Sequence, residues 1–462
     1  MKRIAFGAIA LALLVAFVGY AAADAMDKVP GVLTIAPAPP AMSSPMPSAP
    51  PSASPTDPPL PTSEGLTAAL GPALADPALG ASVAMTVLDA DTGQELFAQA
   101  TDSPRTVASL QKLISAMVVS STLPLDKTLR TGLVEGADGR LVLQAGGDLY
   151  LNPGAGDPSA TIGHAGLADL ADKAAVVLGE QSGPWVLSLD TQYADGPEIL
   201  DTWSSIDVAY GYTGRVSNLG LAPDRADEGK PSPANPARRT ADVLAALLTE
   251  RGIPTTVAPA DTLRADYQQV RSVAEVESAP IEDLLAVALQ DSDNALMEEL
   301  ARVAYFDARE TQDTSIGLFL TRVAASRGIA ESDLQIVDAS GLSSGQTVTV
   351  RALAQTLRLA TDGTHQDWRQ VALRLPIAGL SGTLAERFDD PDTQQWAGIP
   401  REKTGTLTGT SAVGGWTVDA DGRSLLYVVV ADEVSPSFAS GTVPARAALD
   451  RVVGVLTSCG CQ

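Results

Sequence analysis

Histidine and cysteine are nearly absent from this sequence, which has two of each among 462 residues. His164 and His365 are too few for a histidine-rich zinc site and argue against a Ser-His-Asp triad, although either could act as a single base. Cys459 and Cys461 both lie in the last four residues, so the chain has no disulfide framework. The pair is either a local disulfide or two free thiols, and it makes a poor metal site. We therefore predict no bound metal.

Positive charge is also scarce. The chain has 31 Lys and Arg against 55 Asp and Glu, which gives a net charge of −24. Nucleic acid and anionic lipid headgroups carry the same sign, so this balance argues against both as partners. General solubility is the simplest interpretation of the acidity. The length suffices for two or three domains, and a hydrophobic content of 45% is typical of a globular protein.

The N-terminus has the features of an export signal. Lys2 and Arg3 precede an uncharged, largely apolar run from Ile4 to Ala23, and Ala21–Asp24 resembles a cleavage site. The run is also long enough to span a bilayer without being cleaved, and the flanking charges fit either case. We predict an exported protein of the cell envelope that is secreted or anchored in the membrane only through this segment.

Composition divides the rest of the chain. Pro, Ala and Ser dominate up to about Glu64, which predicts an extended linker, and the folded part is expected to begin near Leu66. Strand-like runs then alternate with Pro- and Gly-rich loops and one helix at 239–252, whereas helical patterns dominate from Ile281. The predicted segments are 1–28 as signal or anchor, 29–64 as linker, 65–130 and 275–462 as the two parts of a catalytic domain, and 131–274 as an inserted domain.

The two ends of the folded part both look strand-rich. Ser82–Ala100 predicts two strands joined at the turn "DADTG", and residues 401–458 predict a strand, a hairpin and a closing helix. One antiparallel sheet assembled from both ends, with helices on its faces, would satisfy this pattern. We predict an α+β fold with a mixed inserted domain.

Three short motifs could carry chemistry, and the first is S-x-x-K at Ser109 and Lys112. It lies in "TVASLQKLISA", an apolar stretch that predicts a helix. Residues i and i+3 share a helix face, so the amine could reach the hydroxyl, and burial would favour the neutral amine that a general base requires. The motif is common by chance, and when it is taken alone a lysine whose stem reaches out to solvent is the favoured explanation.

The other two motifs are S-D-N and K-T-G-T. Ser292, Asp293 and Asn294 lie between two predicted helices, where a hydroxyl could relay a proton and an amide could bond a lysine; a simple helix cap is the alternative. Lys403 to Thr406 lie on a predicted strand, where the glycine would let a substrate backbone approach and the lysine would attract a carboxylate. An ordinary edge strand with a solvating lysine is the alternative.

Taken together, the three motifs favour a functional interpretation over a purely structural one. The chain has only seven lysines and four asparagines, and each motif occurs once, in the order S-x-x-K, S-x-N, K-T-G. K-T-G alone should occur by chance roughly 0.05 times in a chain of this composition. Each motif also falls on the kind of element that its chemistry needs. We therefore interpret Lys112 as a functional residue.

The triple resembles the penicillin-binding protein and serine β-lactamase superfamily. The 180 residues between Lys112 and Ser292 are too many for a class A β-lactamase. They are similar to the D-alanyl-D-alanine carboxypeptidase/endopeptidase family called penicillin-binding protein 4, or peptidase family S13, which has extra domains at this place. The likeness runs from about Leu66 to the C-terminus. Further matches are "AGGDLYL" (including Gly146, Gly147 and Asp148), "DASGLS" (Asp338–Ser343) and "GLSGTL" (Gly379–Leu384), with Ala339 and Ser381 where the family usually has Gly and Asp.

The resemblance implies a transpeptidase-like fold and a serine DD-peptidase that cleaves peptidoglycan stem peptides, needs no cofactor and is inhibited by β-lactams. Ser109 would be the nucleophile and Lys112 its base, with Ser292 and Asn294 assisting proton transfer. Backbone N–H groups of Ser109 and Thr406 would form the oxyanion hole. The residues implied to bind substrate are Lys403, Thr404, Gly405 and Thr406 near the terminal carboxylate, and Asp190, which is equally well an acidic residue that ends a strand.

Two other functions fit the same motifs. A serine β-lactamase would share the acylation step but deacylate rapidly, and a non-catalytic cell-wall binding protein would keep the fold without the reaction. The balance of carboxypeptidase and endopeptidase activity, the type of peptide cross-link and the oligomeric state are not encoded in these motifs.

Overall fold

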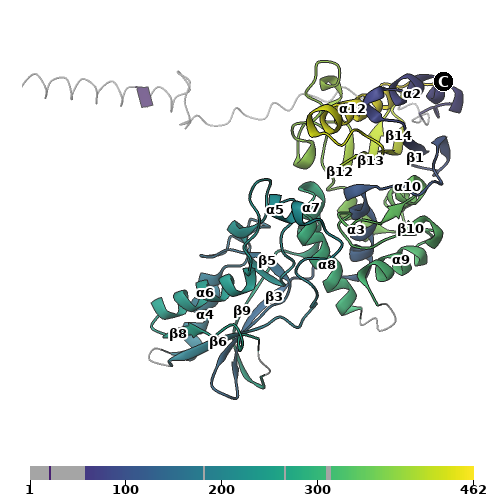
Figure 1. Ribbon diagram of the computed structural model, residues 1–462. Coiled ribbons are helices and arrows are strands. Elements are labelled where there is room, and N and C mark those ends of the chain that lie inside the picture. Colours follow the sequence, from purple (N-terminus) through teal and green to yellow (C-terminus); the bar gives the residue numbers. More distant parts are fainter. Residues whose placement is uncertain (1–19, 22–57, 180–182, 265–266, 309–313) are drawn as a thin grey trace, which may run out of the picture. The chain divides into compact units, whose positions relative to one another are not determined.

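The computed structural model describes residues 20–21, 58–179, 183–264, 267–308 and 314–462 (Figure 1). The chain divides into two units, 1–57 and 58–462, and the account below concerns the second. Nearly all of the predicted signal or anchor segment and most of the predicted linker lie outside the described residues. Of the helices in the described ranges, none has the length and apolar character needed to cross a bilayer.

The main sheet is antiparallel and is assembled from both ends of the unit, as predicted. Its strand order is β12-β13-β14-β1-β2, so the first strand pairs with the last, with Val83 opposite Ala431. Each strand presents one face to each of two apolar layers, which is why β14 is buried along nearly its whole length. The strands are β1 Val83–Asp89, β2 Glu95–Gln99, β12 Arg401–Leu407, β13 Thr410–Val418 and β14 Ser424–Ala431.

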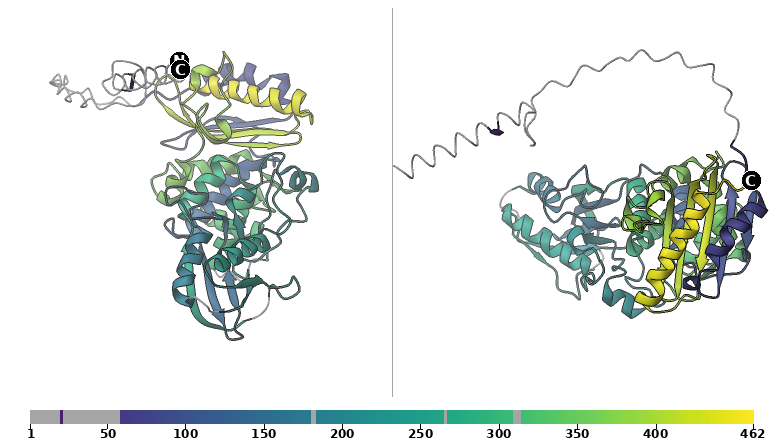
Figure 2. Two further views of the ribbon diagram at one scale, coloured as in Figure 1. Left: turned by 90° about the vertical axis from the view of Figure 1, so that its left-hand side faces the viewer. Right: turned by 90° about the horizontal axis from the view of Figure 1, so that it is seen from above.

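Two helices, α2 (Ser63–Leu74) and α12 (Val443–Thr457), pack against each other on one face of this sheet (Figure 2, left). α2 begins earlier than the predicted start of the fold near Leu66, because Thr62 caps it: the Thr62 Oγ1 accepts a hydrogen bond from Gly65 at 3.1 Å. The backbone N–H of Thr62 also donates to the Cys461 carbonyl at 2.7 Å. Cys459 and Cys461 form a disulfide, which decides between the two predicted states of the pair.

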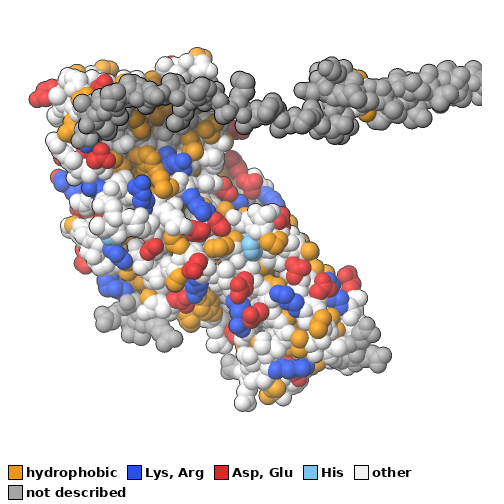
Figure 3. All heavy atoms as spheres, turned by 180° about the vertical axis from the view of Figure 1, so that it is seen from behind, with side chains coloured by type: hydrophobic (Ala, Val, Ile, Leu, Met, Phe, Trp, Pro, Cys, Tyr) orange, Lys and Arg blue, Asp and Glu red, His pale blue; other side chains and the backbone are white. Residues whose placement is uncertain are grey.

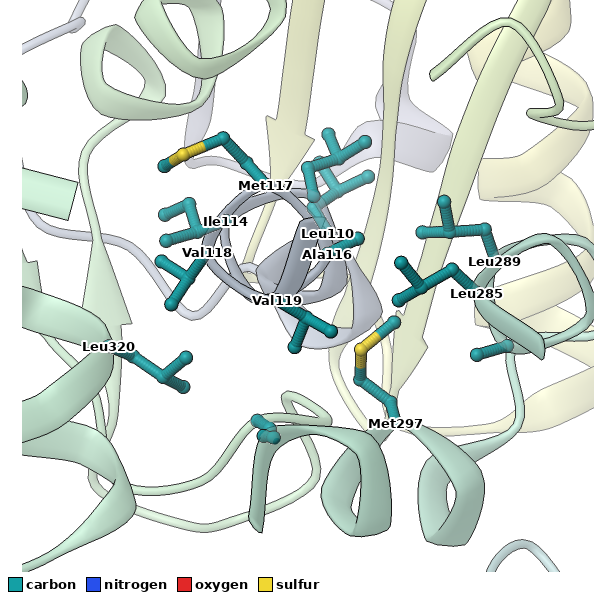
Figure 4. Packing of buried hydrophobic residues seen from close by; sticks show 14 of the residues in the cluster. Leu110, Ile114, Ala116, Met117, Val118, Val119, Leu285, Leu289, Met297 and Leu320 are labelled. Atoms are coloured by element: carbon teal, nitrogen blue, oxygen red, sulfur yellow. The ribbon is translucent and has the colours of Figure 1, made fainter. Parts of the chain in front are cut away.

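The opposite face of the sheet is covered by helices arranged around α3 (Gln111–Thr122), ten of whose twelve residues are buried (Figure 4). Met117 and Val118 are fully buried there, and burying each such side chain stabilises the fold by about 1.5–3 kcal/mol. The helix ends before Pro124, which cannot continue it. The surrounding helices are α7 Ile281–Gln290, α8 Asn294–Asp307, α9 Ile316–Ser326, α10 Val350–Leu359 and α11 Gln366–Ala372.

A second, mixed sheet is built by the chain between Arg130 and Glu277, in the order β8-β6-β4-β3-β9. β3 is antiparallel to β4 and β9, whereas β4, β6 and β8 are parallel. Its own apolar core lies under α4 and α6. The division at 131 and 274 into a separate domain stays a prediction. The elements are β3 Arg130–Gly136, β4 Leu141–Gln144, β6 Trp185–Asp190, β8 Thr255–Val257, β9 Gln269–Glu277, α4 Leu167–Leu178 and α6 Pro236–Glu250.

The prediction of one helix in this region was wrong, because α4 and the short α5 (Ser205–Tyr210) accompany α6. The buried face of α4 includes Leu167, Leu170, Ala171 and Ala174, which have helical spacing. Two of the four are alanines, so the apolar periodicity is weak in the sequence.

On the face shown in Figure 3, acidic and basic side chains are interspersed.

Several short elements complete the unit. The strands β5 and β7 form a small parallel pair, and β10 pairs antiparallel with β11. These strands are β5 Asp148–Leu151, β7 Leu219–Leu221, β10 Leu334–Gln335 and β11 Thr347–Val348. The helical turns are η1 Pro77–Leu79, η2 Ala108–Leu110, η3 Ala222–Asp224, η4 Glu331–Asp333, η5 Gly382–Leu384, η6 Gln394–Trp396 and the π-helical η7 Phe438–Thr442.

Candidate active site

Ser109 lies in η2, a 3₁₀ turn that leads into α3 rather than in the α-helix itself. The residue before it, Ala108, has a φ of +50°, a left-handed conformation that costs about 1–2 kcal/mol for a residue with a Cβ atom. Two glycines pack against this turn. A Cβ on Gly341 would lie 2.1 Å from the Ala108 carbonyl oxygen, and one on Gly405 would lie 2.7 Å from the carbonyl just before the turn. The "DASGLS" and "KTGT" motifs thus both need glycine to approach the Ser109 backbone.

Lys112 is fully buried, which rules out a side chain that reaches solvent. Its Nζ lies 2.9 Å from the Ser109 Oγ. It also donates to the Asn294 Oδ1 at 2.5 Å and to the Ser340 carbonyl oxygen at 2.6 Å. These contacts bring the S-x-x-K motif, the S-D-N motif and the "DASGLS" segment to one nitrogen atom.

The burial of Lys112 changes its acid–base behaviour. Removal from water lowers the pKa of Lys112 to about 7, because the charged form loses more solvation than the neutral form. Nearby carboxylates of Asp338, Asp293 and Glu298 oppose this change by favouring the ammonium. A large fraction of the amine is therefore neutral near pH 7, as a general base for Ser109 requires.

Both interpretations of the S-D-N segment apply, because it caps a helix and its asparagine also bonds Lys112. Asp293 is the N-cap of α8, since its Oδ1 accepts from the Leu296 N–H at 2.9 Å. Its Oδ2 accepts from the Tyr150 hydroxyl at 2.5 Å and from the Arg225 Nε at 2.8 Å. Residues contributed by the chain between 130 and 277 therefore hold this loop in place.

Asn294 and Ser292 flank that cap. The Asn294 Nδ2 donates to the Tyr212 carbonyl at 2.7 Å, which orients its Oδ1 toward Lys112. Ser292 has a φ of +57°, so it adopts a left-handed conformation although it has a Cβ atom, as Ala108 does beside Ser109. Within the part of the chain that the structure describes, its hydroxyl has no hydrogen-bond partner, so it is free to bond a substrate atom.

The K-T-G-T motif lies on β12, the edge strand of the main sheet. Lys403 is fully buried, and its Nζ donates to the Thr404 carbonyl at 2.8 Å. Burial, together with the neighbouring Lys112, holds the pKa of Lys403 well below its ordinary value. The Thr404 hydroxyl bonds the hydroxyl of Thr383, from the "GLSGTL" segment, at 2.8 Å, and the Thr406 Oγ1 accepts from the Arg446 Nη2 at 3.3 Å.

Asp338 holds the segment that presents the Ser340 carbonyl to Lys112, a role that its sequence motif did not reveal. Its carboxylate accepts seven hydrogen bonds, including one at 2.7 Å from the Trp203 Nε1. The Glu298 Oε2 accepts from the Ala339 N–H at 2.9 Å and secures the same turn from α8. Despite burial, these donors keep the pKa of Asp338 below its ordinary value.

Asp338→Asn should destabilise the protein strongly, because every partner of the carboxylate is a donor and the new amide NH₂ would face some of them. We expect the free energy of unfolding to fall by about 3–5 kcal/mol in urea titrations. Penicillin acylation should slow in any folded fraction. Asp362→Asn is the matched control, since Asp362 is half-buried and bonds only Thr364 and His365, and it should lose about 1–2 kcal/mol. Equal losses in both variants would contradict the assigned role.

Asp190 does not join this group of contacts. It ends β6, where its Oδ2 accepts from the Tyr267 hydroxyl at 2.8 Å and its Oδ1 from the Gln192 N–H at 3.1 Å. The inserted region instead reaches the site through Tyr212, Tyr150 and Trp203. In the described residues no group of His, Cys, Asp and Glu side chains has the arrangement of a metal site.

Comparison with known proteins decides the family. The family model described as the D-Ala-D-Ala carboxypeptidase 3 (S13) family matches residues 66–230 and 226–452. The chain belongs to this family. The serine-peptidase class that the motifs predicted is thereby confirmed.

Individual relatives of this S13 peptidase support the family assignment. The carboxypeptidase DacB of Mycolicibacterium smegmatis is 33% identical over 479 aligned positions, which cover 99% of this chain and 97% of the relative. A carboxypeptidase of Mycobacterium tuberculosis is 30% identical, with 87% and 85% covered. The crystal structure of penicillin binding protein 4 (dacB) from Haemophilus influenzae matches with a TM-score of 0.65 at 17% identity, covering 86% of this chain and all of that one. This likeness confirms the predicted fold.

Proposed function

We propose that this S13 peptidase cleaves the D-Ala-D-Ala bond of peptidoglycan stem peptides through an acyl-enzyme on Ser109. The observation that carries the proposal is the buried Lys112 Nζ at 2.9 Å from the Ser109 Oγ, in an environment that brings its pKa to about 7. A weak hydroxyl nucleophile and a partly neutral amine within hydrogen-bond distance are what serine acyl transfer needs.

In the acylation step, the Ser109 Oγ attacks the carbonyl carbon of the penultimate D-alanine and its proton passes to the Lys112 Nζ. The carbonyl oxygen becomes an oxyanion, stabilised by the backbone N–H groups of Ser109 and Thr406. The C–N bond then breaks, and the departing D-alanine amine receives a proton through the Ser292 hydroxyl. Asn294 holds Lys112 in position throughout.

Deacylation reverses the chemistry with water in place of D-alanine. Water adds to the ester carbonyl, its proton moves to Lys112, and Ser109 leaves as a hydroxyl. Thr404 and Thr406 would bond the terminal carboxylate of the substrate, with Gly405 allowing close approach and the buried Lys403 contributing positive charge from beneath. No step in this scheme needs a metal or a cofactor.

The site of action follows from the substrate. S13 relatives named carboxypeptidases and a relative crystallised with a β-lactam support the cell envelope as the location and β-lactams as inhibitors. Cross-linked peptides are further substrates in this proposal. The membrane enters it only through residues 4–23, which would act either as a cleaved signal or as an anchor.

The proposal predicts a covalent adduct on one residue and release of one amino acid. After incubation with benzylpenicillin, peptide mapping by mass spectrometry should find the penicilloyl group on Ser109, and a diacyl-L-Lys-D-Ala-D-Ala peptide should release D-alanine. An adduct on another residue would contradict the nucleophile assignment. Rapid turnover of nitrocefin without release of D-alanine would instead support the β-lactamase alternative, and absence of both reactions would support a non-catalytic binding protein.

A further inference from the structure

Arg446, in the first turn of α12, is a cation next to the site. Its side chain is half-buried. Across the described ranges of the chain, no carboxylate lies within ion-pair distance of its guanidinium. Its contacts are the hydrogen bond to the Thr406 Oγ1 and the ring of Phe438, whose centroid lies 5.9 Å from the Arg446 Cζ. A half-buried arginine without an anion is costly unless it meets one during function.

The acid nearest in sequence is already neutralised. Asp450, one turn further along α12, accepts from the Arg387 Nε at 3.0 Å and 2.9 Å through its two carboxylate oxygens. Arg387 also donates to the Arg446 carbonyl oxygen at 3.1 Å, so it lies beside Arg446 and lowers its pKa further than burial alone does. Asp450 is therefore committed to another arginine. The carboxylate of Glu228 also favours the charged form of Arg446, but among the described residues it makes no ion pair with it.

The position of Arg446 tells which anion it would meet. Its partner Thr406 follows Gly405, which packs against the turn that holds Ser109. Tyr212, whose side chain interacts electrostatically with Arg446, accepts a hydrogen bond from Asn294 through its carbonyl oxygen. Arg446 thus lies beside the K-T-G-T strand, on the side where the S-D-N loop is anchored. Lys403 cannot present its charge to solvent there, because it is fully buried.

We infer that Arg446 binds the C-terminal carboxylate of the substrate together with the Thr406 hydroxyl, and so sets the requirement for a free carboxylate. The inference rests on the proposed function and adds a residue to it. A guanidinium pairs with a carboxylate through charge-assisted hydrogen bonds, which are stronger than those of a hydroxyl alone. Arg446 would then make the enzyme prefer peptides that end in a free D-alanine over the same peptides with an amide end.

The test compares two peptides, diacyl-L-Lys-D-Ala-D-Ala and its C-terminal amide, as substrates of the full-length enzyme. In Arg446→Ala we expect kcat/KM for the acid to fall by about 10- to 100-fold while that for the amide changes by less than about twofold. Arg446→Lys should restore part of the preference for the acid, and Arg446→Gln, which can keep the bond to Thr406 without the charge, should not. Benzylpenicillin and its methyl ester give a second acid and ester pair, read as acylation rates.

Arg451→Ala is the matched control, because Arg451 is on the same helix but pairs with Asp76 at 2.7 Å. Its acid-to-amide ratio should equal that of the wild type. An unchanged ratio in both Arg446→Ala and Arg446→Gln would overturn the inference and leave the proposed function intact. A wild-type enzyme that released neither D-alanine nor D-alaninamide would instead refute the proposed function, on which the inference depends.

Discussion

Ser109→Ala is expected to abolish labelling by a fluorescent penicillin and to reduce D-alanine release by about 10⁴-fold or more. In the proposed mechanism the hydroxyl oxygen becomes acylated, and no other group in the site replaces it. The variant should fold normally, because Lys112 keeps its bonds to Asn294 and Ser340. In-gel fluorescence and a D-alanine assay measure the two effects, and thermal unfolding checks the fold.

Ser115→Ala is the control for this result. Ser115 lies in α3, six residues after Ser109, and is fully buried, but its Oγ donates to the Ala339 carbonyl at 2.7 Å rather than facing Lys112. Its loss should cost about 1 kcal/mol of stability and leave penicillin labelling intact. Labelling that persisted in Ser109→Ala would contradict the assignment of Ser109 as the acylated residue.

Lys112→Ala should slow acylation of Ser109 by about 10²–10⁴-fold, because the proton of the attacking hydroxyl loses its acceptor. It should also leave the Asn294 and Ser340 oxygens without their donor, at a cost of about 1–3 kcal/mol each. Lys112→Met, which fills the same space, separates lost packing from lost chemistry. Lys127→Ala is the control, since Lys127 pairs with Asp307 at a partly exposed position and should retain full acylation.

The pH dependence of acylation gives an independent measurement of the same residue. With a pKa of about 7, Lys112 is neutral in about a tenth of the molecules at pH 6 and about nine tenths at pH 8. The acylation rate should therefore rise with pH through about 7 and then level off. Stopped-flow measurement with a chromogenic β-lactam would show this; a rate already level below pH 6 would mean that a different group accepts the proton.

Much of the fold could be predicted from local sequence patterns. The turn residues between β1 and β2, the hairpin β13–β14 and the apolar run of α3 each carry their own signal over a few residues. α4 was missed because small alanines form half of its buried face, and the start of α2 was missed because its cap follows a proline-rich stretch. Both depend on weak local signals that tertiary packing reinforces.

The catalytic motifs were also legible, since S-x-x-K, S-D-N and K-T-G are rare in combination and each specifies a chemistry through its residue types. Their order and spacing led to the family that the comparisons confirm. The roles of all the site residues, Ser109 and Lys112 included, remain proposals, and Asp190 has its contacts elsewhere, with Tyr267.

What the sequence alone determined here is the family and the sheet built from both ends, because each depends on neighbours in the chain; it also proposed the reacting groups. Only the tertiary structure decided that Lys112 is buried against Ser340, that Asp338 gathers seven donors and that the Arg446 guanidinium bonds Thr406. Burial and charge pairing depend on contacts between segments that lie hundreds of residues apart in the sequence. Local sequence patterns do not predict which of these segments are in contact.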